Sequence, residues 1–458
     1  MNIIERLIEP KKDIPAERKR YSNTQLFRLI VPIIIEQFLL MVVGIADTMM
    51  ISHVTEAAVS GVSLTNQLVN VFLLVFTAMA TGGAVVASQY VGARDQDNGN
   101  LAVGQLLMST TVISVGIALL LYIFGSQLFS LLFGKVEADV FKAGVEYLNI
   151  MLISFPSLAI YNSCAGVYRS MGKTRTIMNI SMIMNVINVI GNYIGVFILH
   201  AGVAGVAWPT VASRLFGAIV MLVISQNRNN TLYVRFRNVF TLRPDMVKRI
   251  FTVAIPNAVE GGLFQLSKVA LSSIVALFGT AQIAANGVAQ SFWSMAALFG
   301  VAMGPAFVTV IGQYIGANDP EGADYYLQKL WRFTYVGAII WNFAFFFISL
   351  PLLNLYSLSQ EAHDLVIILM IIHNVGCAMF STTSVPNGFR AAGDIKWTMY
   401  CSIFSTVVCR VILSIILGLW MNLGVIGIAL AMVGDWAIKT LLVILRYRSG
   451  KWIHKKLI

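Results

Sequence analysis

The stretch Pro32-Ile33-Ile34-Ile35-Glu36 opens a long apolar segment, and the similar stretch Pro256-Asn257-Ala258-Val259-Glu260 opens another one in the second half of the chain. The same offset separates Gln89-Tyr90-Val91-Gly92-Ala93 from Gln313-Tyr314-Ile315-Gly316-Ala317. Tyr168-Arg169-Ser170-Met171-Gly172 likewise precedes Phe389-Arg390-Ala391-Ala392-Gly393 by nearly the same interval. The chain therefore consists of two related halves. Related membrane halves are typical of secondary transporters, in which one half moves against the other to give alternating access.

The composition indicates an all-α integral membrane protein. Apolar residues make up 57% of the chain and charged residues only 12%, against roughly 25% charged residues in soluble domains. Long uniform apolar runs of about 20 residues predict helices that cross a hydrocarbon core of about 30 Å, whereas a barrel would show short alternating segments. We expect twelve transmembrane helices in two pseudo-symmetric six-helix bundles around a central cavity. The predicted spans are 26–51, 60–90, 101–124, 140–163, 176–198, 203–225, 249–277, 282–315, 331–355, 363–386, 397–419 and 424–446.

The positive charges predict the orientation of the chain. The net charge is +11, but most of the 32 Lys and Arg residues fall in loops on one side of the predicted membrane. Only Lys135 and Lys142 fall in the opposite loops. This is the positive-inside pattern, which places both termini in the cytoplasm of a multi-pass protein of the cell (inner or plasma) membrane. The basic charge therefore predicts orientation and argues against nucleic-acid binding.

Five regions follow from this layout. They are a cytoplasmic N-terminal segment (1–25), an N-terminal six-helix lobe (26–225), a cytoplasmic basic linker (226–248), a C-terminal six-helix lobe (249–446) and a cytoplasmic basic tail (447–458). The N-terminal segment has two open interpretations: it lies amphipathically on an anionic leaflet, or it is a disordered tail. Prolines inside spans, at positions 156, 209, 256, 305 and 386, predict kinks. Thr81-Gly82-Gly83-Ala84 predicts close helix contact rather than a phosphate loop, because no Lys-Ser/Thr pair follows it.

The chain resembles the multidrug and toxic compound extrusion family over nearly its whole length. The resemblance rests on Gly44-Ile45-Ala46-Asp47-Thr48, on 80–84 and 89–93, and on the Arg-containing loops at 168–173 and 388–394. It implies a cation-coupled exporter with two six-helix lobes around a central cavity, which expels organic cations or amphiphiles in exchange for Na⁺ or H⁺. It also implies that Asp47, with the asparagines of the fifth helix, forms the ion or proton site of the N-terminal lobe. The acidic residue that some members carry in the tenth helix is absent, because 374–383 contains no carboxylate.

The residues themselves support a cation or proton site at Asp47. Ionisable side chains inside a membrane usually face a cavity or a partner. The carboxylate of Asp47 can hold Na⁺ together with amide oxygens, in which case Asp47 is the metal ligand, or it can take up a proton. Asn185, Asn188 and Asn192 recur at helical spacing and form one stripe. The alternative is that these asparagines only hydrogen-bond neighbouring helices together.

Further charged residues suggest a proton path and a C-terminal site. Glu36 lies eleven residues, or about three turns, before Asp47 on the same side of the helix. In the other half, Glu260, Gln265, Lys268 and His373 are the candidates for a C-terminal site. The alternatives for Glu36 and Glu260 are a gate or a structural anchor.

Three positively charged residues of the C-terminal half call for partners. Lys268 is the least expected of them, because a mid-span lysine demands a carboxylate, tunes a proton site or favours an anionic substrate. Asp435 and Lys439 are four residues apart and are predicted to pair, with Arg410 joining them from the eleventh helix.

Three function classes remain after this reading. The first is a multidrug antiporter with a substrate cavity for which Tyr161, Trp293 and Asn374 are candidates. The second is a lipid-linked oligosaccharide flippase of the same superfamily, for which Lys268, Arg214 and Arg410 would supply a cationic cavity. The third is an integral-membrane transferase, although the chain has no Asp-rich diphosphate motif and no Walker motif. We expect no catalytic residue, no cofactor beyond the coupling ion, and small substrates and lipids as partners without an obligate protein partner.

Overall fold

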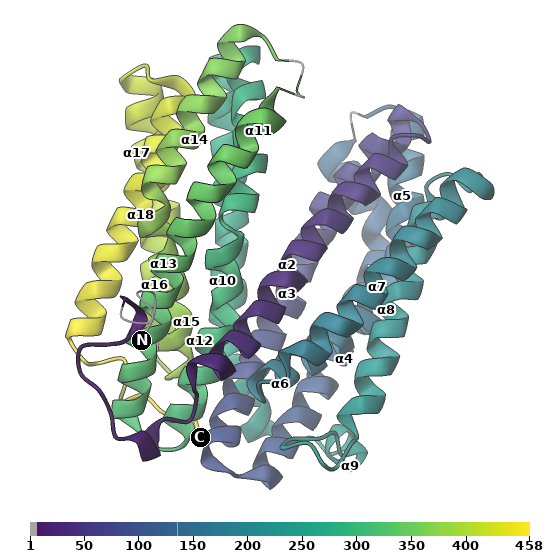
Figure 1. Ribbon diagram of the computed structural model, residues 1–458. Coiled ribbons are helices and arrows are strands. Elements are labelled where there is room, and N and C mark those ends of the chain that lie inside the picture. Colours follow the sequence, from purple (N-terminus) through teal and green to yellow (C-terminus); the bar gives the residue numbers. More distant parts are fainter. Residues whose placement is uncertain (1–6, 135, 355, 357) are drawn as a thin grey trace. The chain divides into compact units, whose positions relative to one another are not determined.

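A computed structural model of the chain describes residues 7–134, 136–354, 356 and 358–458, which form helices and connecting turns without any strand (Figure 1). Among these residues, eleven helices are long and apolar enough to cross a membrane. The number rises to twelve when α5 (Ala138–Ile153) and α6 (Phe155–Ser170), which meet at an angle of 50°, count as one span. The predicted all-helical membrane fold is therefore confirmed. The predictions for residues 1–6 and for Lys135 lie outside the described part.

The chain divides into two compact units, the first of which is Phe27–Ala258. Thr55 and Asp95 begin two of its long helices by accepting hydrogen bonds from the backbone amides of Ala58 and Asn98, as N-cap residues do. The helices are α2 (Asn23–Ile51), α3 (Glu56–Ala93), α4 (Gln96–Phe133), α5, α6, α7 (Thr174–Tyr193) with the π-helical turn η2 (Ile194–Ile198), α8 (Ala204–Ser225), α9 (Phe236–Phe240) and the first part of α10 (Pro244–Val275).

The second unit is Val259–Ile458 together with the described part of residues 1–26. It contains η1 (Ala16–Arg18), the rest of α10 with η3 (Ala276–Phe278), α11 (Thr280–Ala296), α12 (Leu298–Gly316), α13 (Pro320–Leu353), α14 (Gln360–Ser381), η4 (Thr382–Ser384), α15 (Pro386–Ala391), α16 (Ile395–Ser402), η5 (Ile403–Cys409), α17 (Arg410–Ser414), η6 (Ile415–Trp420) and α18 (Gly424–Arg448). Asp319 caps α13 by accepting a hydrogen bond from the amide of Gly322. Asp95 makes the same cap at the equivalent position of the first half.

The repeat extends to single backbone angles. Arg94 and Asn318, which occupy equivalent positions in the two halves, both have positive φ, at 57° and 55°, immediately before these two caps. Gly172 and Gly393 end the two Arg-containing loops with φ of 75° and 93°, a conformation that glycine adopts without steric cost. The two halves therefore share local structure as well as sequence.

The segment before α2 packs within the second unit (Figure 1). Ile8 and Ile14 are buried, and the carboxylate of Glu9 lies 2.6 Å from Nζ of Lys329. Burial alone would raise the pKa of Glu9, but hydrogen bonds from Lys329 and Tyr325 outweigh it and lower the pKa below 4.5. The described part of this segment is thus neither a disordered tail nor a lone interfacial helix, because its apolar residues are buried against the second unit.

The connection between the halves packs in the same way within the first unit. Leu232 and Val234 are buried, and the backbone amide of Tyr233 donates to Oδ1 of Asn100 at 2.7 Å. Gln105 of α4 donates to the carbonyl of Asn238 at 2.7 Å. The polar linker is therefore attached along its length to the helices that precede it.

Prolines coincide with helix interruptions at some positions and not at others. Pro156 follows the 50° bend at Ser154, and Pro386 starts α15 directly after the 3₁₀ turn η4. Pro209, Pro256 and Pro305 lie inside helices that continue past them. At these three positions the helix is maintained despite the hydrogen bond that proline cannot donate.

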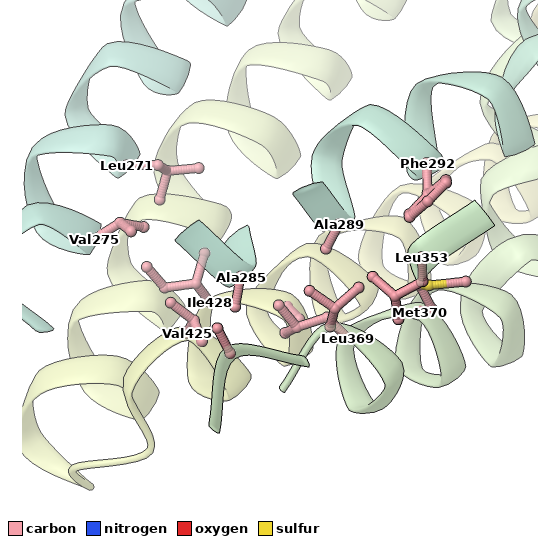
Figure 2. Close-up of a cluster of buried hydrophobic side chains, with 13 residues drawn as sticks. Leu271, Val275, Ala285, Ala289, Phe292, Leu353, Leu369, Met370, Val425 and Ile428 are labelled. Carbon is pink, nitrogen blue, oxygen red and sulfur yellow. The ribbon is translucent and has the colours of Figure 1, made fainter. Parts of the chain in front are cut away.

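Each unit has its own apolar core. In the second unit, side chains from α10, α11, α13, α14 and α18 converge, as Figure 2 shows for Leu271, Ala289, Leu369 and Ile428.

In the first unit, the backbone of α3 approaches α10 at Gly82, where a Cβ atom would lie 2.8 Å from the carbonyl oxygen of Ile250. The prediction that this glycine pair serves close helix contact is confirmed.

Candidate functional site

Asp47 meets two of the asparagines of α7, Asn188 and Asn192, in the first unit. Asp47 lies one turn before the end of α2. Nδ2 of Asn192 donates to Oδ1 of Asp47 at 2.6 Å and also lies 3.3 Å from Oδ1 of Asn188. Asn188 in turn donates to Oγ1 of Thr210 on α8 at 2.9 Å. Three helices therefore converge on one carboxylate, as the Asn188–Asn192 spacing of one turn predicts.

Arg214 of α8 adds a positive charge to this cluster. It interacts electrostatically with Asp47 and with Tyr147 of α5. Its guanidinium nevertheless donates to Oγ of Ser154, at 2.8 Å, rather than to the carboxylate. Arg214 thus balances the charge of Asp47 without occupying its oxygens, an arrangement that the sequence did not reveal because the two residues are far apart in the chain.

One oxygen in the cluster has no protein partner. Oδ1 of Asn192 is buried and accepts no hydrogen bond from any described residue. A buried polar atom of this kind calls for water, a proton donor or an ion. Together with the carboxylate of Asp47, it gives two oxygens of the type that hard cations prefer. Among the described residues, no group of three or more His, Cys, Asp or Glu gathers into a site for a multivalent metal. The cluster suits a single monovalent cation or a proton.

Glu36 and Glu260 occupy equivalent positions and have equivalent partners. Oε1 of Glu36 lies 2.6 Å from Nη2 of Arg169, and Glu260 pairs with Arg390. Both arginines come from the repeated Arg-containing loops, so the repeat itself was the signal that could have paired them. Glu36 is buried in this pair. In the structure, Arg169 lies in the last turn of α6 and Arg390 in the last turn of α15, not in loops. Glu36 and Glu260 therefore make helix-to-helix contacts and lie outside the Asp47 cluster.

The predicted pairing of Asp435 with Lys439 is wrong, whereas the predicted participation of Arg410 is confirmed. Asp435 of α18 accepts two hydrogen bonds from Arg410 of α17, at 2.6 and 3.1 Å. Oγ1 of Thr406 lies 3.4 Å from the other carboxylate oxygen. Arg410 is the favoured partner of Asp435 because its planar guanidinium donates two hydrogen bonds to one carboxylate. The ammonium of Lys439, one helical turn away on α18, cannot donate in this two-pronged geometry.

Three of the predicted candidates line one pocket in the second unit. The pocket is small and is lined by Ala289, Phe292, Trp293, Ala296, Phe345, Ser349, Met370, His373 and Asn374. Trp293 stacks on His373 with 5.2 Å between ring centroids. Neither ring nitrogen of His373 makes a well-aligned hydrogen bond to a described residue. Tyr161 lies in the other unit, buried against Gly217.

The remaining candidates lie together on α10. Lys268 is exposed, with Nζ 5.4 Å from the ring centroid of Phe264. Gln265 is half-buried, three residues before Lys268. The structure does not bring either of them into the pocket around Trp293.

Comparison with known proteins identifies the family. The MatE family model matches residues 32–194 and 256–416, which are most of the chain and correspond to its two repeated halves. The chain belongs to the MatE family. The resemblance seen in its motifs is thus confirmed.

Similar relatives span the whole chain. An uncharacterized transporter, YisQ of Bacillus subtilis, is 28% identical over 468 residues, covering 97% of this chain and 98% of that protein. A probable multidrug resistance protein, NorM of Thermotoga maritima, is 24% identical over 458 residues, covering 97% and 95%. The MatE chain is therefore a multi-pass membrane transporter and not an enzyme, which removes the transferase hypothesis.

Solved structures share the fold. A transporter of the MOP superfamily from Pyrococcus furiosus, reported with reversed polarity of its binding pocket, has a TM-score of 0.87 at 17% identity, covering 98% of this chain and all of that one. An outward-facing multidrug resistance MATE transporter has a TM-score of 0.86 at 18% identity, covering 96% of this chain and all of that one. At this identity the likeness concerns the MatE fold alone.

Proposed function

We propose that this MatE transporter exports organic cations or amphiphilic compounds in exchange for Na⁺ or H⁺, with the coupling ion bound at Asp47. The observation that carries the proposal is the contact of Asp47 with Asn192, whose Oδ1 is buried and has no partner among the described residues. The names of relatives such as NorM of Thermotoga maritima support the export of drugs.

The positive charge of Arg214 favours release of the ion from the site, because it compensates the Asp47 carboxylate once the ion has left. When the ion is bound, it neutralises the Asp47 carboxylate. When the ion has left, Arg214 supplies a compensating positive charge. The empty site is therefore close to neutral, which lowers the cost of holding it inside a membrane. Coupling then requires only that ion and substrate prefer different conformations of the two halves.

The other candidates take supporting roles in this proposal. Glu36 and Glu260, each paired with an arginine, anchor the last turns of α6 and α15. Trp293, His373 and Asn374 offer aromatic and polar side chains for contact with part of a substrate. The transporter works in the cell membrane with both termini in the cytoplasm, and it needs no cofactor beyond the ion, no nucleic acid and no obligate protein partner.

A flippase for lipid-linked oligosaccharides is the second candidate, favoured by the positive charges of the C-terminal half. A diphosphate headgroup would require several unpaired cations. Arg410 pairs with Asp435 and Arg390 pairs with Glu260, which leaves Lys268 and Lys439 without an ion pair among the described residues of these helices. The paired arginines favour a substrate with less negative charge.

The test is transport in vesicles with a fluorescent organic cation, driven separately by a Na⁺ gradient and by a pH gradient. The variants are Asp47→Asn and the matched control Asp139→Asn, which makes the same charge change at an exposed position at the start of α5. We expect one gradient to drive dye movement in the wild type and the control, and to fail in Asp47→Asn. Gradient-driven transport that persists in Asp47→Asn would refute the assignment of the coupling site.

A further inference from the structure

The two halves carry charges of opposite polarity at related positions. In the first half, the acid lies on the first helix (Asp47) and the base on the sixth (Arg214). In the second half, the first helix α10 carries the base Lys268, and the last helix α18 carries the acid Asp435. By the offset that relates the two proline-led stretches, Lys268 falls three residues, about one turn, before the equivalent of Asp47. The second half therefore presents a cation where the first presents an anion.

Lys268 has no carboxylate partner among the described residues. Its ammonium lies 5.4 Å from the ring centroid of Phe264, and the guanidinium of Arg410 lies 5.7 Å from the same ring. Arg410 is neutralised by Asp435, so the cluster around Phe264 carries one uncompensated positive charge. The phenyl ring of Phe264 attracts the two cations, Lys268 and Arg410, only weakly and does not neutralise their charge.

Lys268 lies well inside its helix. The candidate span runs from Pro244 to Phe278, so Lys268 lies ten residues, or about 15 Å, from its nearer end. The side chain is exposed in the second unit. A charged side chain within a membrane-spanning helix usually faces a cavity or a partner rather than lipid.

The backbone beside the cluster is also specialised. The π-helical segment η5 ends at Cys409, directly before Arg410, whereas the equivalent stretch of α7 in the first half is regular α-helix. Oγ of Ser267 on α10 donates to the carbonyl of Thr406 within η5 at 3.2 Å. Insertions of this type are frequent at functional sites. Here the hydrogen bond from Ser267 connects α10, which carries Lys268, to η5, the π-helical segment that directly precedes Arg410.

We propose that Lys268, Phe264 and Arg410 form a binding site for the anionic group of an amphiphilic organic anion, such as an aromatic carboxylate or sulfonate. This inference rests on the proposed export of amphiphilic compounds and concerns the anionic ones among them. Lys268 supplies the charge, Phe264 a face for the apolar body, and Arg410, held by Asp435, the neighbouring positive field. The single uncompensated charge favours a monoanion over a diphosphate.

The test is equilibrium dialysis of radiolabelled 1-naphthoate against purified protein in phosphatidylcholine nanodiscs, with 1-naphthylmethylammonium as the cationic analogue of similar size. No ion gradient is present, so the outcome does not depend on coupling at Asp47. The variants are Lys268→Met, Lys268→Arg and the control Lys248→Met, which removes the same charge from an exposed position near the start of α10. Thermal unfolding of each variant verifies its folding.

We expect the wild type, Lys268→Arg and Lys248→Met to bind naphthoate with similar affinity, and Lys268→Met to bind it at least tenfold more weakly. A tenfold loss corresponds to about 1.4 kcal/mol. Asp47→Asn is expected to bind naphthoate like the wild type, which separates a failure of this proposal from a failure of ion coupling. Equal binding by folded Lys268→Met, no binding by the wild type, or tighter binding of the cationic analogue would each overturn the proposal.

The same anionic chemistry could come from a lipid headgroup, so the dialysis is repeated with phosphatidylglycerol in the nanodiscs. Competition that lowers naphthoate binding to the wild type would assign the anion site to a lipid headgroup and overturn the assignment to a transported anion. Unchanged naphthoate binding would assign the site to free organic anions, as proposed.

Discussion

The ion pair of Asp435 with Arg410 is buried, and we expect removal of one partner to lower stability more than removal of one partner of a surface ion pair. The side chains are only 1% and 6% exposed, and Arg410 makes two hydrogen bonds to the carboxylate, at 2.6 and 3.1 Å. Removal of one partner leaves a buried charge uncompensated, at a cost of about 3–5 kcal/mol. Replacement of both partners by apolar residues of similar volume is often neutral or stabilising. We therefore expect Asp435→Leu to lower the free energy of unfolding by about 3–5 kcal/mol.

The double variant Asp435→Leu/Arg410→Met should recover most of that loss. The assay is reversible unfolding in mixed micelles with increasing dodecyl sulfate, analysed as a double-mutant cycle. The control is Glu321→Gln, which breaks an exposed pair with Arg18, where the two side chains are 63% and 48% exposed. This control should lose less than about 1 kcal/mol. A loss of stability in Asp435→Leu no larger than in the control, or a double variant that loses the sum of the two single changes, would refute this prediction.

Three further predictions concern other contacts. Gly82→Leu should lower stability by several kcal/mol or prevent folding, measured by thermal unfolding, because its Cβ would lie 2.8 Å from a backbone oxygen that has no room to move; wild-type stability would contradict the packing described. Because the folded-state pKa of Glu9 is lowered, its contact with Lys329 stabilises the protein above pH 4.5 and is lost as the pH falls through the folded-state value. Hydrogen exchange of residues 7–22 should therefore accelerate only below pH 4.5, and acceleration already at neutral pH would refute this. Arg169→Leu should destabilise the protein because Glu36 is left buried and unpaired, whereas Arg169→Leu with Glu36→Gln should recover stability in the same unfolding assay; equal stability of the single and double variants would contradict this pairing.

The two-lobed helical architecture could be predicted from the sequence because repeats and long apolar runs are properties of the chain itself. The contact of Asp47 with Asn192 was also predictable, since the asparagines recur on one helix face and the first-helix motif resembles that of a known family. The unpartnered oxygen of Asn192 depends on side-chain orientation, which no sequence pattern reveals.

Pairings between helices were the least predictable feature. The spacing of Asp435 and Lys439 suggested a local pair, but local spacing says nothing of a competitor on another helix, and Arg410 offers two donors in fixed geometry. The N-terminal segment looked polar, yet two buried isoleucines, the Glu9–Lys329 pair and hydrogen bonds such as that from Tyr21 to Gln313 hold it within the second unit. The partner of Glu9, Lys329, belongs to the other half of the chain, beyond the range of any local pattern.

The most direct test of the central claim measures the ion rather than the substrate. Substrate is added to one side of vesicles containing the protein, and the movement of ²²Na⁺ and of protons is recorded without an imposed ion gradient. The account predicts that substrate evokes a flux of one of these ions in the wild type and in Asp139→Asn, and that the flux is lost in folded Asp47→Asn. An equal ion flux in Asp47→Asn would contradict the account, because the coupling ion would then bind elsewhere.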